Sequence, residues 1–81
     1  MKPPMIRILE AFQEQPLTIS EAGDHANLSR AAAYVRVHQL VKTKCLVGGD
    51  YVRQGRRGAL AEVFTITALG RRCLRRSQGR S

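Results

Sequence analysis

Residues 17–33 read LTISEAGDHANLSRAAA and contain two candidate helix starts with a candidate turn between them. Ser20 and Ser29 are the N-cap candidates, because a serine hydroxyl accepts a hydrogen bond from the backbone N–H groups that open a helix. Between them, Asn27 tolerates the left-handed backbone conformation of a tight turn. The stretch therefore predicts a brief helix, a turn around Asn27 and a second helix that begins at Arg30.

The second helix is expected to run from Arg30 to about Lys44 with one face turned toward the core. With Ala33 as the inward reference, the helical period places these residues on or near the same side: Val37, Leu40, Val41 and Lys44. The same period turns another set outward: Ala31, Tyr34, Val35, His38 and Lys42.

A further helix is expected before this stretch. One apolar helix face is indicated by residues at the i, i+3, i+4, i+7 spacing: Met5, Ile8, Leu9 and Phe12. Pro3 and Pro4 suit a helix entry, and Pro16 stops the helix near Gln15. Residues 17–19 then form a short β-prone link.

The period changes near residue 46, where β-prone residues replace the helical pattern. Residues 46–47 and 51–52 are short β-prone pairs separated by Gly48-Gly49-Asp50 in the first expected strand, and residues 62–66 are the second strand. Between the strands, residues 52–59 read VRQGRRGA. This segment is expected to be the basic tip of a β-hairpin.

The C-terminal region is expected to close the fold with one more helix. Thr67 is its N-cap candidate, and the helix is expected to run from Ala68 through Leu74. Residues 75–81 are rich in Arg, Ser and Gly and are expected to fray, so we assign residues 1–76 to one domain and 77–81 to a basic disordered tail. The expected fold class is α+β, with a three-helix core, a β-hairpin wing and a closing C-terminal helix.

Positive charge is concentrated in the second half of the chain. Residues 1–40 contain four Lys/Arg and four Asp/Glu, whereas residues 41–81 contain ten Lys/Arg and two Asp/Glu, which accounts for the net charge of +8. A polarised basic surface attracts polyanions, because each phosphate that it neutralises releases condensed counterions. Nucleic acid is therefore the first partner to consider.

Several classes of function are not expected. No apolar run approaches the roughly 20 residues that span a bilayer, and no signal-peptide pattern is present, so we expect a cytoplasmic protein with no membrane partner. Asp24, His25 and His38 lack the spacing that metal binding or nucleophilic catalysis requires, so no enzyme, metal site or cofactor is expected. Cys45 and Cys73 are expected to be reduced packing residues, with a redox switch as the alternative.

Three segments resemble winged helix-turn-helix DNA-binding proteins, in particular MarR-type and PadR-type bacterial regulators. Residues 17–33 resemble their helix-turn-helix, and residues 40–47, LVKTKCLV, resemble the junction of recognition helix and first wing strand. Residues 64–72, FTITALGRR, contain the T-x-x-G exit from the wing. Together, over residues 5–74, the segments imply a winged helix-turn-helix fold that binds double-stranded DNA.

The sequence also departs from this family. MarR-type wings commonly pair Asp with Arg at the tip, where this chain has no acidic residue, and Cys45 stands where a glycine usually ends the recognition helix. The extra terminal helices that build a dimer and a ligand pocket in MarR-type repressors have no counterpart here. The resemblance therefore does not imply small-molecule sensing.

The recognition helix and the wing supply the expected DNA contacts. Because an α-helix fits the major groove with its N-terminal outward residues nearest the bases, we expect contacts from Ser29, Arg30, Ala31, Ala32, Tyr34 and Val35. Arg30 is expected to contact guanine or a phosphate, Val35 and the alanine methyls thymine methyl groups, and Tyr34 a phosphate or sugar. Arg36 and His38 suit backbone phosphates. The wing arginines suit the minor groove or its phosphates: Arg53, Arg56 and Arg57.

Several of these residues have a structural alternative. Arg56 and Arg57 also suit a solvated hairpin, Tyr34 suits a packed surface aromatic, and His38 suits a plain exposed position. The arginines between residues 71 and 76 either complement the C-terminal end of the last helix or attract DNA at long range.

The expected function is sequence-specific binding of double-stranded DNA by a small transcriptional regulator, such as a repressor. An origin in a phage, plasmid or mobile element is suggested by small size alone. The alternative function is a winged-helix interaction module whose basic wing binds an acidic partner. RNA binding is less favoured, because few aromatic residues are available for base stacking. A homodimer is expected to use apolar residues of the first and last helices: Met5, Phe12, Leu69 and Leu74.

Overall fold

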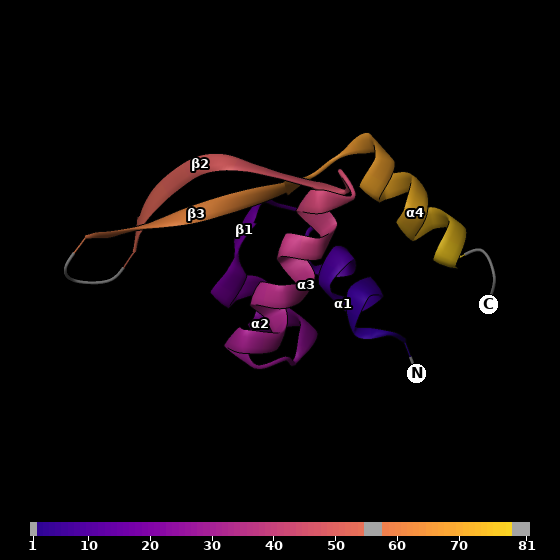
Figure 1. Ribbon diagram of the computed structural model, residues 1–81, viewed down its shortest axis with the longest axis horizontal. Helices are drawn as coiled ribbons and strands as arrows, with labels where there is room; N and C mark the ends of the chain where they lie inside the picture. The colour runs from indigo at the N-terminus through magenta and orange to yellow at the C-terminus, as the bar shows by residue number, and fades with distance from the viewer. Residues whose placement is uncertain (1, 55–57, 79–81) are drawn as a thin grey trace.

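The elements of the computed structural model, which describes residues 2–54 and 58–78, follow the expected order. They are α1 (Pro4–Ala11), β1 (Leu17–Thr18), α2 (Ile19–Ala26), α3 (Arg30–Lys42), β2 (Leu46–Gln54), β3 (Ala59–Ile66) and α4 (Ala68–Gln78). Helices α1, α2 and α3 cluster beside the sheet, the β2–β3 hairpin projects to one side, and α4 lies at the opposite end (Figure 1). The expected α+β fold, with a hairpin wing and a closing helix, is confirmed.

The sheet is antiparallel, with strand order β1-β3-β2. The link at residues 17–19 contributes β1, in which Leu17 lies opposite Phe64 of β3. The strand expected from the β-prone pairs at residues 46–47 and 51–52 is β2, which continues through Gly48-Gly49-Asp50 while its register against β3 shifts between Val47 and Asp50. Gly49 adopts a φ of 119°, which favours glycine, so the chain passes this point in a bulge without ending the strand.

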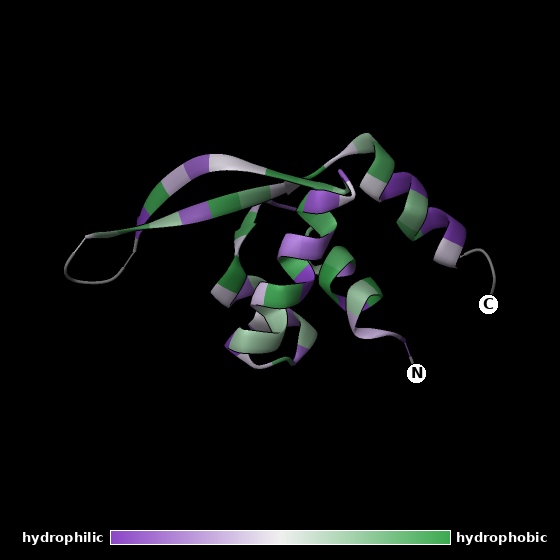
Figure 2. Cartoon of the chain, viewed as in Figure 1, coloured by the Kyte–Doolittle hydropathy of each residue, from purple (hydrophilic) through white to green (hydrophobic). Residues whose placement is uncertain are grey.

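One core connects the helices to the sheet. Its buried members are Ile8, Leu9, Phe12, Leu17, Ala22, Ala26, Ala33, Val37, Leu40, Cys45, Leu46, Phe64, Ile66 and Leu74. The inward face expected for α1 and the expected inward positions of α3 up to Val41 are confirmed, and Figure 2 shows green, apolar segments where the helices face one another. Phe12 and Leu74 are buried within this single chain, so the expectation that they form a dimer surface is wrong.

Helix α2 begins two residues earlier than expected. Thr18, and not Ser20, is its N-cap: the Thr18 hydroxyl accepts the Glu21 N–H at 3.2 Å, and the Glu21 carboxylate accepts the Thr18 N–H at 2.9 Å. This capping box satisfies two backbone donors, whereas a lone serine cap satisfies one. The expected turn is confirmed, because Asn27 is left-handed, with a φ of 57°, and the Leu28 N–H donates to the Gly23 carbonyl at 2.9 Å.

Helix α3 ends at Lys42 and not at Lys44. Lys44 adopts a left-handed φ of 70°, and the Cys45 N–H donates back to the Leu40 carbonyl at 2.8 Å. These are features of a Schellman helix end, in which the left-handed position is usually glycine. Lys44 is therefore exposed, and the expectation that it lies on the inward side is wrong.

Two other helix ends differ from expectation. Helix α1 ends at Ala11, with Phe12 as its C-cap, and residues 13–15 bend before Pro16. Helix α4 continues past Leu74 to Gln78. The positive charges of Arg75 and Arg76 in its last turn stabilise the helix, because they lie near the negative end of its dipole. Two residues assigned to a disordered tail, 77 and 78, are thus helical, while residues 79–81 lie outside the described residues.

The T-x-x-G segment joins the end of α3 to the start of α4. The Thr67 hydroxyl lies 2.6 Å from the Lys44 carbonyl oxygen and 3.1 Å from that of Cys45, and it accepts the Gly70 N–H at 3.0 Å. A Cβ atom on Gly70 would collide with the Cys45 carbonyl oxygen and lie 2.8 Å from Ile66 Cγ1. Thr67 is therefore the expected N-cap, and Gly70 permits the close contact.

Candidate nucleic-acid interface

The N-terminal half of α3 presents an exposed face. Ser29 caps the helix by accepting the Ala32 N–H at 3.2 Å, as expected. The expected outward residues are exposed: Arg30, Ala31, Tyr34, Val35 and His38. Ala32 and Arg36 are half-buried, because they lie beside the buried strip of Ala33 and Val37. The start of α3 therefore offers a guanidinium, a phenol and small apolar groups to solvent.

An aromatic row connects this face to the sheet. The centroids of the Tyr34 and His38 rings lie 4.2 Å apart. The His38 ring also packs in a T-shaped arrangement with the buried Phe64 ring, with 6.2 Å between the two centroids. Tyr34 is nevertheless 56% exposed. Residues four apart on a helix are neighbours, so this Tyr34–His38 spacing was a signal that the sequence contained. His38 is exposed, as expected, and its ring also contacts those of Tyr34 and Phe64.

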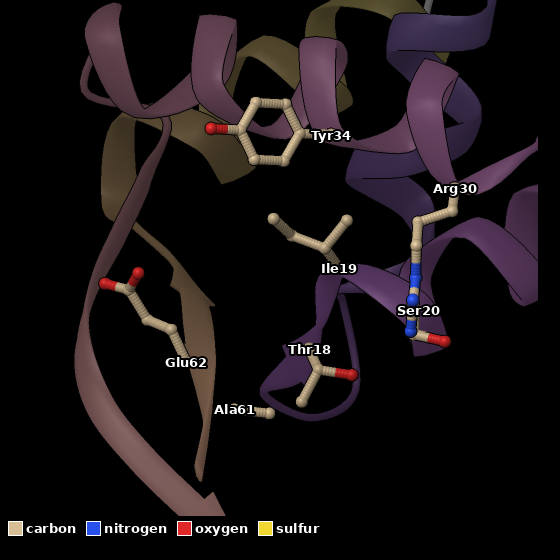
Figure 3. A pocket seen from close by; sticks show the side chains of 7 residues that line it. All are labelled: Thr18, Ile19, Ser20, Arg30, Tyr34, Ala61 and Glu62. Carbon is tan, nitrogen blue, oxygen red and sulfur yellow. The ribbon is translucent and has the colours of Figure 1, made fainter. Parts of the chain in front are cut away.

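A hollow separates α3 from the wing. Its volume is about 230 Å³, and it is lined by Thr18, Ile19, Ser20, Arg30, Tyr34, Ala61 and Glu62. Figure 3 shows Tyr34 and Arg30 on the α3 side, Glu62 and Ala61 on β3, and Ile19 at the start of α2. Sequence reasoning found Arg30 and Tyr34 but missed the other five, because only the fold brings β1, α2 and β3 beside α3.

The Glu62 carboxylate is held at the wing side of this hollow. It accepts the Gly49 N–H at 3.0 Å. A Cβ atom on Gly48 would collide with this carboxylate and would lie 2.9 Å from the Phe64 ring. The β2 bulge at residues 48–49 therefore makes room for Glu62 and gives its charge a backbone partner.

The described part of the wing carries both charge and apolar surface. Arg53 is exposed and lies opposite Leu60 in the β2–β3 register, and its guanidinium passes near Gly58, which has a φ of 66°. Tyr51 and Leu60 are also exposed, Leu60 to 67%. The expected site residues Arg56 and Arg57 lie outside the described residues. Sequence reasoning missed Tyr51 and Leu60, although alternation along each strand is a signal for one exposed face.

The cations of this surface are not neutralised within the described chain. Arg30 and Arg53 have no salt bridge in residues 2–54 and 58–78, and Arg36 donates to the Gln39 side chain at 3.2 Å. Four arginines of α4 are exposed at the end of the molecule opposite the wing: Arg71, Arg72, Arg75 and Arg76. Arg71 donates to the Gln13 carbonyl at 3.3 Å. The two groups of arginines therefore form separate basic surfaces.

Within residues 2–54 and 58–78, no group of three or more His, Cys, Asp or Glu side chains is placed to hold a metal ion. Among the described helices, none combines the length and the apolar content that a bilayer crossing requires.

Comparison with solved structures shows which proteins share this architecture. A PadR family transcription regulator from Clostridium difficile superposes with a TM-score of 0.81 at 13% identity, covering 95% of this chain and 84% of that one. Bacillus subtilis PadR in complex with operator DNA gives 0.81 at 14% identity, covering 96% of this chain and 48% of that one. The Streptomyces coelicolor PcaV transcriptional regulator superposes with a TM-score of 0.72 at 26% identity, covering 93% of this chain and 53% of that one.

The chain thus spans about half the length of PadR from B. subtilis and of PcaV. No protein-family model and no curated protein matches the sequence. The aligned part of this chain includes its helix-turn-helix, its three-stranded sheet with the hairpin, and its closing helix. The chain therefore has the winged helix-turn-helix fold that the sequence predicted, and it shares this fold with PadR-family regulators.

Proposed function

We propose that the chain binds double-stranded DNA with sequence specificity and acts as a transcriptional regulator. The observation that carries this proposal is the exposed start of α3, where Arg30, without a salt bridge in the described chain, lies beside Tyr34 and Val35. A helix end of this kind fits the major groove, and the neighbouring hairpin then meets the adjacent minor groove or backbone. The solved complex of B. subtilis PadR with operator DNA supports the same class of partner.

In this proposal, Arg30 contacts a base edge and Val35 contacts the methyl group of a thymine, while Tyr34 contacts the sugar-phosphate backbone. The 4.2 Å contact with His38 limits the motion of the Tyr34 ring, so less side-chain entropy is lost when Tyr34 meets DNA. His38 then positions Tyr34 and has no phosphate contact of its own. Arg53 neutralises backbone phosphates beside the wing.

Glu62 adds a repulsive element to the same surface. A phosphate that entered the hollow would meet its carboxylate, and like charges at short range are unfavourable. The Glu62 side of the hollow therefore accepts a sugar or a base edge more readily than a phosphate, whereas Arg30 lines the other side, and this difference limits the registers in which the duplex can bind. Glu62→Gln is expected to strengthen binding to unrelated duplexes more than binding to the preferred one.

The salt dependence of duplex binding tests this proposal. The logarithm of the association constant is expected to fall against the logarithm of salt concentration with a slope of about −4 to −7, since each phosphate contact contributes about −0.9. Arg53→Ala should make that slope shallower by about 1. Arg72→Ala, a matched change on α4 at the opposite end, should leave it unchanged. A flat salt response of the unmodified protein contradicts the proposal.

A second candidate function is protein binding through the wing. The exposed Tyr51 and Leu60 side chains favour it, because aromatic and apolar anchors are common in protein interfaces. Under this alternative, the chain binds an acidic partner and shows no preference among duplex sequences. Replacing Leu60 by serine would then weaken partner binding, while DNA affinity would stay the same.

We also propose a homodimer, which would use only Met5 and Leu69 of the four apolar residues expected from the sequence, because Phe12 and Leu74 are buried. Leu69 of α4 is 40% exposed, and Met5 is half-buried against the core. A two-fold dimer through this end would bind a palindromic DNA site. Sedimentation of the protein at increasing concentration tests it directly, and Leu69→Glu should keep the protein monomeric.

A further inference from the structure

The two cysteines meet between the end of α3 and the first turns of α4. The Cys45 Sγ and Cys73 Sγ atoms lie 4.0 Å apart, close enough for the Cys45 thiol to donate to Cys73. A disulfide bond is about 2.05 Å long, so a side-chain adjustment of roughly 2 Å would join them. This contact could not be predicted from the sequence, because 28 positions separate the two residues.

The surrounding backbone holds the thiols near one another. The Thr67 N–H donates to the Cys45 carbonyl at 3.0 Å, and Gly70 packs against the same carbonyl. Cys73 follows Gly70 by three residues, so it lies on the same face of α4 as Gly70, the face that contacts Cys45. Bringing the sulfur atoms together therefore requires side-chain rotation and little movement of the helices.

The two thiols differ in access. Cys73 is exposed, whereas Cys45 is buried. Burial of the sulfur raises the pKa of Cys73 above its ordinary value, with a further contribution from Cys45, while the guanidinium groups of Arg76 and Arg72 oppose that shift. An oxidant in solution thus reaches Cys73 first, and Cys45 is the nearby thiol that can react next.

We infer that Cys45 and Cys73 form a reversible redox site, in which a peroxide converts the thiol pair to an intramolecular disulfide that locks α4 to the base of the wing. The Cys73 thiolate attacks one oxygen of hydrogen peroxide, the O–O bond breaks, and hydroxide leaves, giving a sulfenic acid. The Cys45 sulfur then attacks the Cys73 sulfur, an S–S bond forms, and the hydroxyl group leaves as water. Two thiols and one peroxide thus give one disulfide and two waters.

Intact-mass measurement after oxidation tests this site. The reduced 81-residue chain is treated with hydrogen peroxide and then alkylated with iodoacetamide under denaturing conditions. We expect a monomer that has lost two hydrogen atoms and takes up no alkyl group, and a digest in which the Cys45 and Cys73 peptides are linked. Dithiothreitol should restore both alkylation sites.

Single variants and stability provide the controls. Cys73→Ser changes an exposed residue, so it should fold, and it should neither lose two hydrogens nor gain stability with peroxide. The unmodified protein should melt on the order of 10 °C higher when oxidised, because the bond closes the loop that contains the whole wing. The oxidation rate should rise about tenfold from pH 7 to pH 8, as the thiolate fraction of Cys73 does.

Three results would overturn the inference. One is a wild-type protein in which both thiols remain open to alkylation after peroxide treatment. Another is a product that gains oxygen atoms without losing hydrogens, and the third is a disulfide found only between two copies of the chain. None of these outcomes depends on DNA binding, so the redox site and the proposed function are tested separately.

Discussion

Ala33→Leu is expected to destabilise the protein by about 3 kcal/mol, at the upper end of the range for overpacked cores. Ala33 is 0% exposed, and its Cβ atom lies 3.1 Å from the position that a Cβ on Gly23 would occupy. Helices α2 and α3 are thus already in close contact there. Leucine adds three carbon atoms to this contact, and the hydrogen-bonded turn at Asn27 and Leu28 restricts how far the helices can separate.

Ala31→Leu is the matched control on the opposite face of α3. Ala31 is exposed, and leucine has nearly the helix propensity of alanine, so the free energy of unfolding should fall by less than about 0.5 kcal/mol. Its bulk should instead weaken duplex binding by obstructing the groove-facing surface.

Urea unfolding followed by circular dichroism separates the two variants. With a slope of about 1 kcal/mol per M urea for a small domain, Ala33→Leu should lower the midpoint by about 3 M and Ala31→Leu by less than about 0.5 M. If Ala31→Leu is the more destabilising change, the helical register assigned to α3 is wrong. The DNA contacts proposed from that register are then wrong as well.

Three further predictions concern the junction between α3 and α4. Gly70→Ala should cost about 1 to 3 kcal/mol, although alanine favours helices, because its methyl group meets the Cys45 carbonyl; a higher melting temperature would contradict this. Thr67→Val removes the hydroxyl contacts with Lys44, Cys45 and Gly70 and should cost about 2 kcal/mol in chemical unfolding, whereas an unchanged midpoint would mean that they contribute nothing. Lys44→Gly should stabilise by about 0.5 to 1 kcal/mol by relieving the left-handed backbone, a gain that calorimetry can detect or exclude.

Local patterns in the sequence predicted most of the fold. Helical periodicity identified the buried faces of α1 and α3, and Asn27, Ser29 and Thr67 acted as the expected turn and cap residues. These features depend on neighbours within about four residues, which the sequence places directly. The cap of α2 was misassigned because the Thr18–Glu21 capping box was overlooked, although its spacing was present.

Contacts between distant segments could not be predicted in the same way. The hollow beside Tyr34 needs β3 to lie next to α3, and the approach of Cys45 to Cys73 needs the start of α4 to lie beside the residues that follow α3. The end of α3 could not be predicted either, because the left-handed backbone position that ends a helix is usually a glycine, whereas here it is Lys44. Tertiary packing decides the first two features.

Selection of bound duplexes from a random DNA pool tests the central claim most directly. The unmodified protein is expected to enrich one sequence motif, and Arg30→Ala is expected to change the preferred base at one position of that motif while Arg72→Ala leaves the motif intact. A pool in which the unmodified protein enriches no motif would contradict the claim that α3 recognises DNA sequence.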